Sequence, residues 1–216
     1  MYYDITKRLF DVFSSIFLIM LFSPIMLLTA MIIKLTSKGP ILVEKENKHL
    51  MRIGKNGRIF RLYKFRSMPV NSDSLITRDP RYRNLYREWK KSNFKLYNDP
   101  RVSKFGKFIR KYSIDEMPQL FNVLKGEMSL VGPRPYHKDE LSEQLKRYPH
   151  TRDFIRETQT VKPGITGFWQ VSGRSNVNFD RRIEMDAYYA QKKSLILDIL
   201  IILKTPLAMI TGAGAV

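Results

Sequence analysis

The sequence predicts an α+β fold that is mostly helical, with a small β-hairpin, surface amphipathic helices and an N-terminal re-entrant membrane helix. Three observations lead to this fold class. A run of 22 uncharged residues, Val12 to Ile33, lies near the N-terminus. Apolar residues recur at amphipathic-helix spacing further along, and Arg58 to Arg66 alternates basic with apolar residues as a strand does. At 216 residues we expect an anchor, residues 1–38, and one folded domain, residues 39–216.

Charge and cysteine content restrict the classes of partner and site. The chain has 38 Lys and Arg against 20 Asp and Glu, a formal charge of +18, which indicates a polyanionic partner such as a membrane, a nucleic acid or a phosphorylated substrate. No cysteine is present, which excludes disulfides, thiolate metal sites and thiol nucleophiles. The histidines, His49, His137 and His150, lie at no ligand spacing, so we expect no zinc site built on them.

The apolar run is long enough to span a bilayer, but two features favour a re-entrant helix. Basic residues flank both of its ends: Lys7, Arg8, Lys34 and Lys38. Since topology normally places the basic excess on one side, both ends are predicted to face the cytoplasm, with the domain against anionic lipid headgroups. Pro24 removes a backbone hydrogen bond mid-run and Ser23 can satisfy the freed carbonyl, which predicts a helix–break–helix. A kinked spanning helix remains open, and a signal peptide is the weaker alternative.

The hairpin is predicted around the turn residues Lys55-Asn56-Gly57, followed by the strand Arg58 to Arg66. Lys64 and Arg66 would then share one face of that strand. Such a face is most often only solvated, but in so basic a chain it is also a candidate phosphate contact. Beyond it we expect a polar loop with one helix near Tyr86 to Phe94. Apolar residues at Val102, Phe105, Phe108 and Ile109 then predict a short helix that ends at Arg110-Lys111.

Two adjacent carboxylates, Asp115 and Glu116, precede the clearest amphipathic helix. Its apolar stripe is Met117, Leu120, Phe121 and Leu124, and Gly126 is a typical stop signal. Pro118 is tolerated only near a helix start, which predicts a first turn close to the two acids. Free N–H groups there would favour a phosphate or a metal-bound anion. Neighbouring helical residues diverge by about 100°, so we expect a different role for each carboxylate.

The same residues allow a purely structural interpretation. Ser113 to Glu116 fits the S-x-x-E capping box, and acids in a first turn commonly complement the helix dipole. Pro118 weakens this alternative, because it would fall past the first turn of a helix capped by Ser113.

The C-terminal half carries fewer chemical signals. Asp139 to Thr160 is predicted as a charged surface helix, and Lys162 to Gly167 as a glycine-rich turn that leads into an apolar strand, Phe168 to Val171. A helix over Asp180 to Tyr189 would precede a final apolar helix, Ile199 to Ile210, that belongs to the core or to the membrane surface.

Several short motifs follow one another through nearly the whole chain: Lys7-Arg8-x-x-Asp11 before Ser23-Pro24, Ser37-Lys38-Gly39-Pro40, Tyr63-Lys64-Phe65-Arg66-Ser67-Met68, Asp99-Pro100-Arg101-Val102, Asp115-Glu116-x-Pro118-Gln119-Leu120-x-Asn122-Val123-Leu124-x-Gly126, Val131-Gly132-Pro133-Arg134-Pro135, Pro163-Gly164-Ile165-Thr166-Gly167 and Gly173-Arg174. In this combination the chain resembles the small monotopic phosphoglycosyl transferases of bacterial polysaccharide and glycoprotein assembly. It lacks the additional N-terminal membrane helices of longer relatives, so we expect the minimal form.

The resemblance implies an enzyme on the cytoplasmic face of the bacterial inner membrane. Its implied donor is a UDP-sugar, its acceptor undecaprenyl phosphate and its cofactor Mg²⁺. Asp115 would be the nucleophile that takes the sugar-1-phosphate and expels UMP, and Glu116 would hold the metal. The division fits phosphoryl transfer, because a carboxylate splits the reaction into two steps while metal and arginines neutralise phosphate oxygens.

The resemblance also implies further residues around the substrates. Together with the strand face, it gives these candidates: Lys64, Arg66, Arg110, Arg134, Arg174, Asp186 and Asp198. The chain departs from the family pattern over Val43 to Ile53, which bears on donor specificity. Neither the transferred sugar nor the oligomeric state, a homodimer included, follows from the residues.

Two other functional classes compete with a transferase. The charge of +18 and the aromatics among basic residues would suit a membrane-tethered nucleic-acid-binding module. Such a module needs neither an acidic pair nor a broken apolar segment, so we expect no nucleic acid as partner. The other alternative is an inactive scaffold that recruits transferases, which the presence of the motifs does not exclude.

Overall fold

The structure is a computed structural model that describes residues 2–43, 50–70, 72, 79, 82–91, 96, 99–172 and 177–210. Its helices are α1 (Tyr2–Thr36), α3 (Arg83–Lys91), α4 (Lys104–Lys111), α5 (Gln119–Lys125), α6 (Lys138–Arg147), α7 (Arg152–Thr158), α8 (Phe168–Ser172), α9 (Phe179–Lys192) and α10 (Leu195–Ile210). Its strands are β1 (Met51–Ile53), β2 (Ile59–Arg61), β3 (Ser129–Val131) and β4 (Gly164–Thr166). The mostly helical α+β class is therefore confirmed.

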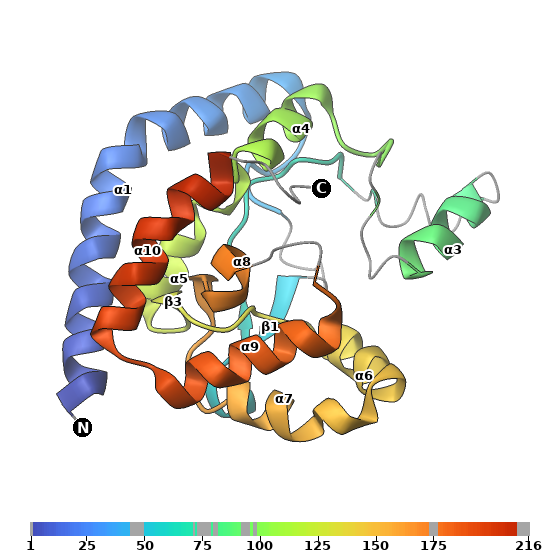
Figure 1. Cartoon of the computed structure of the whole chain (residues 1–216). Coiled ribbons are helices and arrows are strands. Elements are labelled where there is room, and N and C mark those ends of the chain that lie inside the picture. The colour runs from blue at the N-terminus through green and yellow to red at the C-terminus, as the bar shows by residue number, and fades with distance from the viewer. Residues whose placement is uncertain are drawn as a thin grey trace.

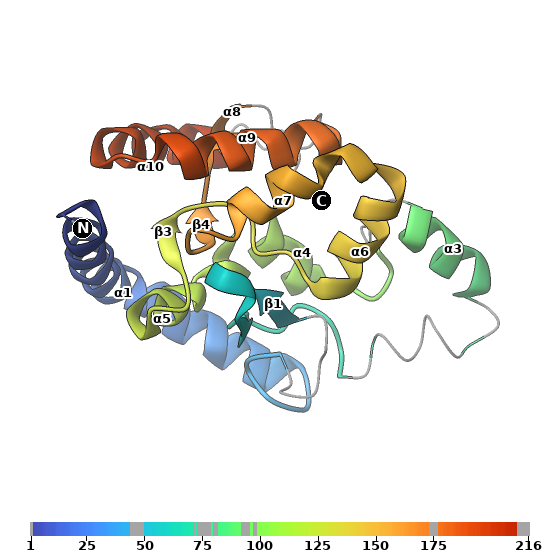
Figure 2. The same ribbon diagram turned by 90° about the horizontal axis from the view of Figure 1, so that it is seen from below.

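The helices enclose the short strands. Figure 2 shows α9 and α10 end to end along one side of the molecule, α1 and α5 along the other, and the strands between them. In both Figure 1 and Figure 2, α3 stands apart from this body. The main core joins the hairpin, α5, β3, α9 and α10 through buried side chains that include Leu62, Val123, Met128 and Ile201.

Helix α1 bends but does not break, so the predicted helix–break–helix is wrong in that detail. Pro24 lies inside the continuous helix, and Figure 1 shows α1 changing direction along its length. The Ser23 hydroxyl donates to the Met20 carbonyl at 2.8 Å. That carbonyl would otherwise bond the N–H that Pro24 lacks, so the compensation expected of Ser23 is present.

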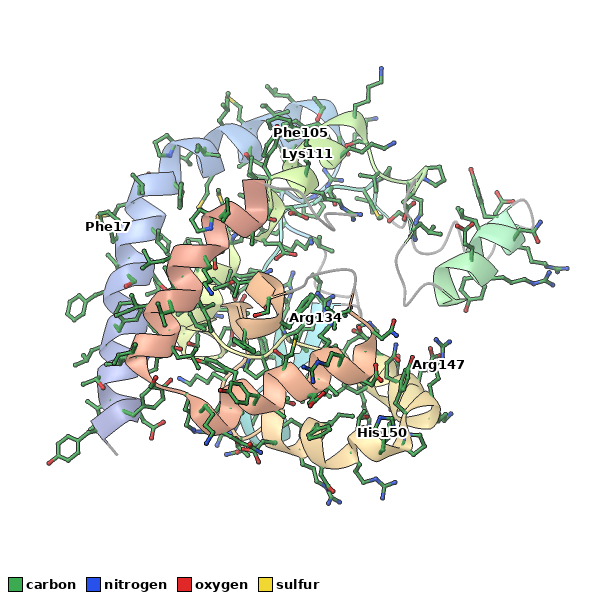
Figure 3. The ribbon with its side chains drawn as sticks, viewed as in Figure 1. Phe17, Phe105, Lys111, Arg134, Arg147 and His150 are labelled. Atoms are coloured by element: carbon green, nitrogen blue, oxygen red, sulfur yellow. The ribbon has the colours of Figure 1, made fainter. Side chains whose placement is uncertain are left out.

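The outer surface of α1 is apolar and exposed. By length and composition the helix could cross a membrane, and only 17% of its most apolar window is buried in the protein. Phe17, which projects from α1 in Figure 3, is 60% exposed, and Leu27 is 70% exposed. Such a continuous apolar surface is expected where a helix contacts lipid.

The inner side of α1 carries buried polar residues that attach it to α10. Lys7 forms ion pairs with Asp11 at 3.1 Å and with Asp198 at 3.0 Å. The Tyr189 hydroxyl donates to Asp198 at 2.6 Å. Asp11 also accepts the Leu130 N–H at 3.1 Å, which ties α1 to β3. Buried charges require such partners, so these contacts fix one position of α1 on the domain.

Arg8 attaches α1 to the helix that follows the acidic pair. Its guanidinium donates to the carbonyls of Val123 and Leu124 at 2.6 and 2.7 Å, near the C-terminal end of α5. The Val123 carbonyl also accepts the Gly126 N–H at 2.9 Å, and a cation is favourable at this end of the helix dipole. Gly126 then ends α5 in the left-handed region with φ 80°, as the sequence predicts.

The hairpin is present but shorter than predicted. Strands β1 and β2 pair antiparallel, with Ile53 opposite Ile59, and the turn between them places Asn56 at φ 57°. Beyond β2 the Leu62 N–H still donates to the Leu50 carbonyl, and a single antiparallel bridge then pairs Phe65 with Leu42. The Phe65 N–H itself donates to the Asp115 carbonyl. Lys64 and Arg66 flank this bridge outside any regular strand, and their side chains have different partners: Lys64 contacts the acidic pair, whereas Arg66 donates to the carbonyls of Ser37 and Lys38.

A second sheet, which the sequence patterns do not predict, is formed by β3 and β4. Strands β3 and β4 pair in parallel, whereas Phe168 to Val171, predicted as a strand, forms helix α8. A Cβ on Gly132 would lie 2.4 Å from the Lys162 carbonyl oxygen, and one on Gly164 would lie 2.1 Å from the Gly132 nitrogen. The glycine-rich turn therefore serves close approach of the two backbones.

Other predicted helices match the structure with changed bounds. Helix α4 and helix α9 confirm the predictions for their segments, while α10 begins at Leu195 and contains Asp198 in its first turn. The predicted helix over Asp139 to Thr160 is two helices, because a 3-10 turn over Pro149–Thr151 separates α6 from α7. Proline lacks the N–H that would continue α6.

Asn122 joins the segment after the hairpin to α5, which yields a stability prediction. Its buried side chain accepts the Tyr63 N–H at 2.9 Å and donates to the Arg61 carbonyl at 2.7 Å. We expect Asn122→Ala to lower the free energy of unfolding by about 2 to 4 kcal/mol, because two backbone groups lose their partners. Unfolding in detergent micelles, with the exposed Gln191→Ala as control, would measure this. Equal stability of the two variants would contradict it.

Candidate functional site

The acidic pair lies on a 3-10 turn, Ile114–Glu116, and α5 begins only after Pro118. Ser113 adopts the left-handed region at φ 54° and makes no side-chain capping bond, so the capping box is excluded. The Glu116 N–H donates to the Ser113 carbonyl at 3.2 Å, and the Met117 N–H donates to Ile114. These two N–H groups are therefore not free for a phosphate, which corrects that part of the sequence argument.

One lysine contacts both carboxylates. The Lys64 ammonium lies 2.8 Å from Asp115 Oδ2 and 3.3 Å from Glu116 Oε1. The side chain of Asp115 is 2% exposed, whereas that of Glu116 is 42% exposed. The two acids therefore share a cation but face different surroundings, whereas their separate roles stay a prediction.

The shared lysine separates the pKa values of the two carboxyls. Burial raises the pKa of Asp115, Lys64 opposes this shift, and the negative charge of Glu116 adds to it. Burial would also raise the pKa of Glu116, but Lys64 and Arg134 outweigh it and lower that pKa. For Lys64, burial alone would lower the pKa, yet Asp115 and Glu116 raise it. The lysine is thus held in its charged form between the two acids.

Two predicted arginines lie near this pair. The Arg110 Nε donates to the Ser67 hydroxyl at 2.8 Å, and burial lowers the pKa of Arg110 against the opposing charge of Asp115. Burial would also lower the pKa of Arg134, but nearby Glu140 and Glu116 help to raise it. Positive charge therefore reaches the acidic pair from helix α4 and from the segment after β3.

Asp186 supports Arg134 from α9. It is fully buried, and its Oδ2 accepts the backbone N–H of Arg134 at 3.2 Å. Burial raises the pKa of Asp186 to about 8, although this hydrogen bond and the charges of Arg182 and Arg134 act against the shift. Its role in the structure is to fix the segment that carries Arg134.

Other predicted residues do not contact the acidic pair. Arg66 donates to the carbonyls of Lys38 and Ser37 at 2.5 and 2.8 Å, at the end of α1. Asp198 is bound by Lys7 and Tyr189, as described above. Arg174 and residues 44–49 of the unusual segment lie outside the residues that the structure describes.

Sequence reasoning missed several residues near Arg134. Arg182 lies with its guanidinium carbon 4.5 Å from the ring centroid of Trp169, and Arg52 experiences the charge of Arg134. Gln119, at the start of α5, hydrogen-bonds the Glu116 side chain. The i, i+4 spacing of Arg182 and Asp186 was one available signal, whereas nothing local distinguishes Arg52.

The expected Mg²⁺ can be tested against the donor groups present. Among the residues that the structure describes, no group of three His, Cys, Asp or Glu side chains could hold a metal. Mg²⁺, however, is commonly bound by one or two carboxylates with water and substrate phosphates as its other ligands. The half-exposed Glu116 beside Asp115 fits such a partial set.

Comparison with known proteins decides the family. The family described as bacterial sugar transferase matches residues 2–212. The chain belongs to this family. It is 44% identical over 215 residues to an uncharacterized sugar transferase of Haemophilus influenzae and 43% identical over 213 residues to an undecaprenyl-phosphate galactose phosphotransferase of Salmonella typhimurium.

Coverage differs among these family members. The alignments cover 98% and 97% of this chain, but only 42% of the Haemophilus and 41% of the Salmonella protein. The exopolysaccharide production protein ExoY of Rhizobium meliloti is 39% identical over 97% of this chain and 87% of its own length. The chain thus corresponds to less than half of the longer sugar transferases and to most of ExoY.

The raised pKa of Asp186 predicts a pH-dependent stability. A carboxyl whose folded-state pKa lies above its unfolded value near 4 contributes stability that is complete below pH 4 and is lost as the pH rises through about 8. The melting temperature of the wild type relative to Asp186→Asn should therefore fall between pH 5 and pH 8.5, because the amide does not titrate. The exposed Asp153→Asn should show no such trend. A difference that is constant with pH would contradict the assignment.

Proposed function

We propose that this protein transfers a sugar-1-phosphate from a UDP-sugar to undecaprenyl phosphate, releases UMP and forms a covalent phosphosugar on Asp115. The observation that carries the proposal is the Lys64 ammonium within 2.8 Å of the buried Asp115 and 3.3 Å of Glu116. A carboxylate held beside fixed cations is suited to attack a phosphorus atom whose oxygens those cations neutralise.

Relatives support the choice of substrates. The Salmonella relative is named an undecaprenyl-phosphate galactose phosphotransferase. A relative from Aeromonas hydrophila, 41% identical over 99% of this chain and 45% of its own length, is named a UDP-N-acetylgalactosamine-undecaprenyl-phosphate N-acetylgalactosaminephosphotransferase. Both names contain the same lipid carrier with different sugars, so the proposal leaves the sugar open.

The first step would form the bond between enzyme and phosphosugar. A carboxylate oxygen of Asp115 attacks the phosphorus next to the sugar, and the bond from this phosphorus to the bridging oxygen of the diphosphate breaks. UMP leaves with that oxygen and its electron pair. Lys64 then exchanges part of its contact with Asp115 for phosphate oxygens, while Arg110 and Arg134 lie close enough to offset the charge of the donor.

The second step would release the product. An oxygen of the lipid phosphate attacks the same phosphorus, the bond to Asp115 breaks, and the carboxylate returns to its ion pair with Lys64. The product is a sugar joined to the lipid through a diphosphate. Because the acidic pair and the exposed apolar helix α1 belong to one compact body, acceptor and nucleophile can meet at the membrane surface.

Glu116 is the residue that would hold Mg²⁺, since it is the exposed member of the pair and its pKa is lowered. When bound, Mg²⁺ would neutralise phosphate oxygens and polarise the phosphorus. Lys64 and Gln119 orient the Glu116 side chain through their contacts with its carboxylate.

The covalent step gives the most direct test. Incubation of the protein with a panel of UDP-sugars should release UMP, and intact-mass measurement should detect one added phosphosugar. Asp115→Asn should abolish both signals, because the amide is not a nucleophile. Glu116→Gln should lower turnover nearly as far and raise the Mg²⁺ concentration that activity requires.

The matched controls are Asp153→Asn and Glu184→Gln, exposed acids away from the pair. Both should release UMP at the wild-type rate. Wild-type UMP release by Asp115→Asn would refute the nucleophile, and an unchanged Mg²⁺ requirement in Glu116→Gln would refute the metal ligand.

We propose that α1 is re-entrant: it bends near Pro24, and both of its ends lie at the cytoplasmic face of the membrane beside anionic lipids. Because the chain has no cysteine, single replacements Tyr2→Cys and Leu35→Cys report each end separately. An impermeant maleimide should label both from the cytoplasmic side only. In the double variant Ser23→Ala, Pro24→Ala, the helix should straighten and residue 2 should become protected from that side.

Ser23→Ala alone keeps the proline and should leave the labelling unchanged. If the two ends of the unaltered helix label from opposite sides of the membrane, the re-entrant proposal is wrong. If the double variant labels like the parent, the bend at Pro24 does not determine the topology.

A further inference from the structure

Buried nitrogen donors without acceptors gather around Arg134. Among the residues that the structure describes, no acceptor is present for Arg52 Nη1, Arg134 Nε, Arg182 Nε or Trp169 Nε1. Unpaired buried donors are rare in proteins and cost about 1 to 3 kcal/mol each, more when charged. A set of them from β1, the segment after β3, α8 and α9 indicates a ligand rich in acceptors.

Trp169 holds two of these arginines in place. Trp169 is 5% exposed, and the guanidinium carbons of Arg182 and Arg134 lie 4.5 and 5.9 Å from the centroid of its ring. A cation over an indole ring is favourable and leaves the edge of the planar guanidinium free for hydrogen bonds. Both arginines are half-buried, so a ligand from solvent reaches part of each side chain.

Arg52 brings a third positive charge to Arg134 from the hairpin. Burial, followed by repulsion from Arg134, lowers the pKa of Arg52 to about 10, against the attraction of Glu140 and Glu116. Neither Arg52 nor Arg134 forms an ion pair within the described part of the chain. An anion bound between these cations would remove their repulsion.

The arginines continue the positive charge of the acidic site. Glu116 experiences the charges of both Lys64 and Arg134. Arg134 also lies over the ring of Trp169, so it is positioned between the acidic pair and the Trp169–Arg182 contact. In Figure 3, Arg134 lies between β1 and α9, away from the apolar α1. A ligand that enters here comes from the aqueous side, which suits a nucleotide better than a lipid.

We propose that Arg52 and Arg182, together with Arg134, bind the diphosphate of the nucleotide-sugar donor, with Trp169 positioning the two guanidiniums that stack on it. The inference rests on the proposed function for the identity of the donor. Arginine offers paired N–H groups that match phosphate oxygens, and a diphosphate supplies acceptors on two phosphorus atoms. The arginine cluster thus fixes the donor while Asp115 attacks it.

The test measures binding without turnover. Asp115→Asn provides a background that does not react, and Trp89→Phe leaves Trp169 as the only tryptophan. The fluorescence of Trp169 would then be titrated with UDP, with pyrophosphate and, separately, with farnesyl phosphate as a lipid-phosphate probe. Arg52→Gln and Arg182→Gln should each weaken UDP and pyrophosphate binding about 10- to 100-fold, as expected for a lost charge-assisted hydrogen bond. Affinity for farnesyl phosphate should change less than twofold.

The matched controls are Arg181→Gln, the exposed neighbour on α9, and Arg58→Gln, an exposed arginine beside β2. Neither should alter UDP binding by more than about twofold, the usual range for surface substitutions. Arg182→Lys keeps the charge but loses the planar fork, so it should give an intermediate loss and serves if the glutamine variant does not fold.

Three results would overturn the inference: UDP affinity in Arg52→Gln and Arg182→Gln equal to that of the controls, no effect of Arg182→Lys, or a loss confined to farnesyl phosphate. These outcomes are separate from failure of the proposed function. If no UDP-sugar yields UMP or an adduct on Asp115, the transfer mechanism is wrong. The binding of UDP and pyrophosphate to the arginine variants does not depend on that reaction and still tests the arginine cluster.

Discussion

The site depends on the contact between one ammonium and two adjacent carboxylates. A carboxylate as buried as Asp115 is costly to ionise, and the Lys64 ion pair at 2.8 Å offsets that cost. The backbone reinforces the arrangement, because the Phe65 N–H donates to the Asp115 carbonyl next to the lysine. The hairpin segment and the 3-10 turn are therefore held together twice, once by charge and once by the main chain.

The same contact explains why adjacent acids acquire different properties. Asp115 faces the interior and Glu116 faces solvent, although one lysine touches both. Divergent side-chain directions within a single turn are enough to produce this difference, since burial raises one pKa and neighbouring cations lower the other. The different surroundings of the two carboxyls thus follow from their position on the turn.

Local patterns predicted much of the helical structure. The apolar spacing of α5 and its stop signal Gly126 were recognisable because they lie within one short segment. The fold class followed from several local patterns of this kind. The parallel pair of β3 and β4 was not, because each strand has only three residues and their pairing joins distant parts of the chain. The apolar run Phe168 to Val171 was assigned wrongly, since four residues do not separate strand from helix by periodicity.

The site was predicted in part for the same reason. The acidic pair and Lys64 were found from motifs, but the motifs do not separate residues that hold the protein together from those beside the acidic pair. The Arg66 side chain donates to the backbone carbonyls of Ser37 and Lys38, and Asp198 forms an ion pair with Lys7. Arg52 and Arg182 meet around Arg134 only through long-range packing, which no local spacing encodes.

The bond between Arg8 and the end of α5 has a mechanical consequence. Arg8 belongs to the helix with the exposed apolar surface, and the carbonyls that it binds belong to α5, which starts three residues after Glu116. Any shift of this part of α1, as bilayer thickness or lateral pressure changes, is passed to the far end of α5 along a rod of about two turns. In a membrane-associated protein the bilayer is therefore a reference surface for the turn that carries Asp115 and Glu116.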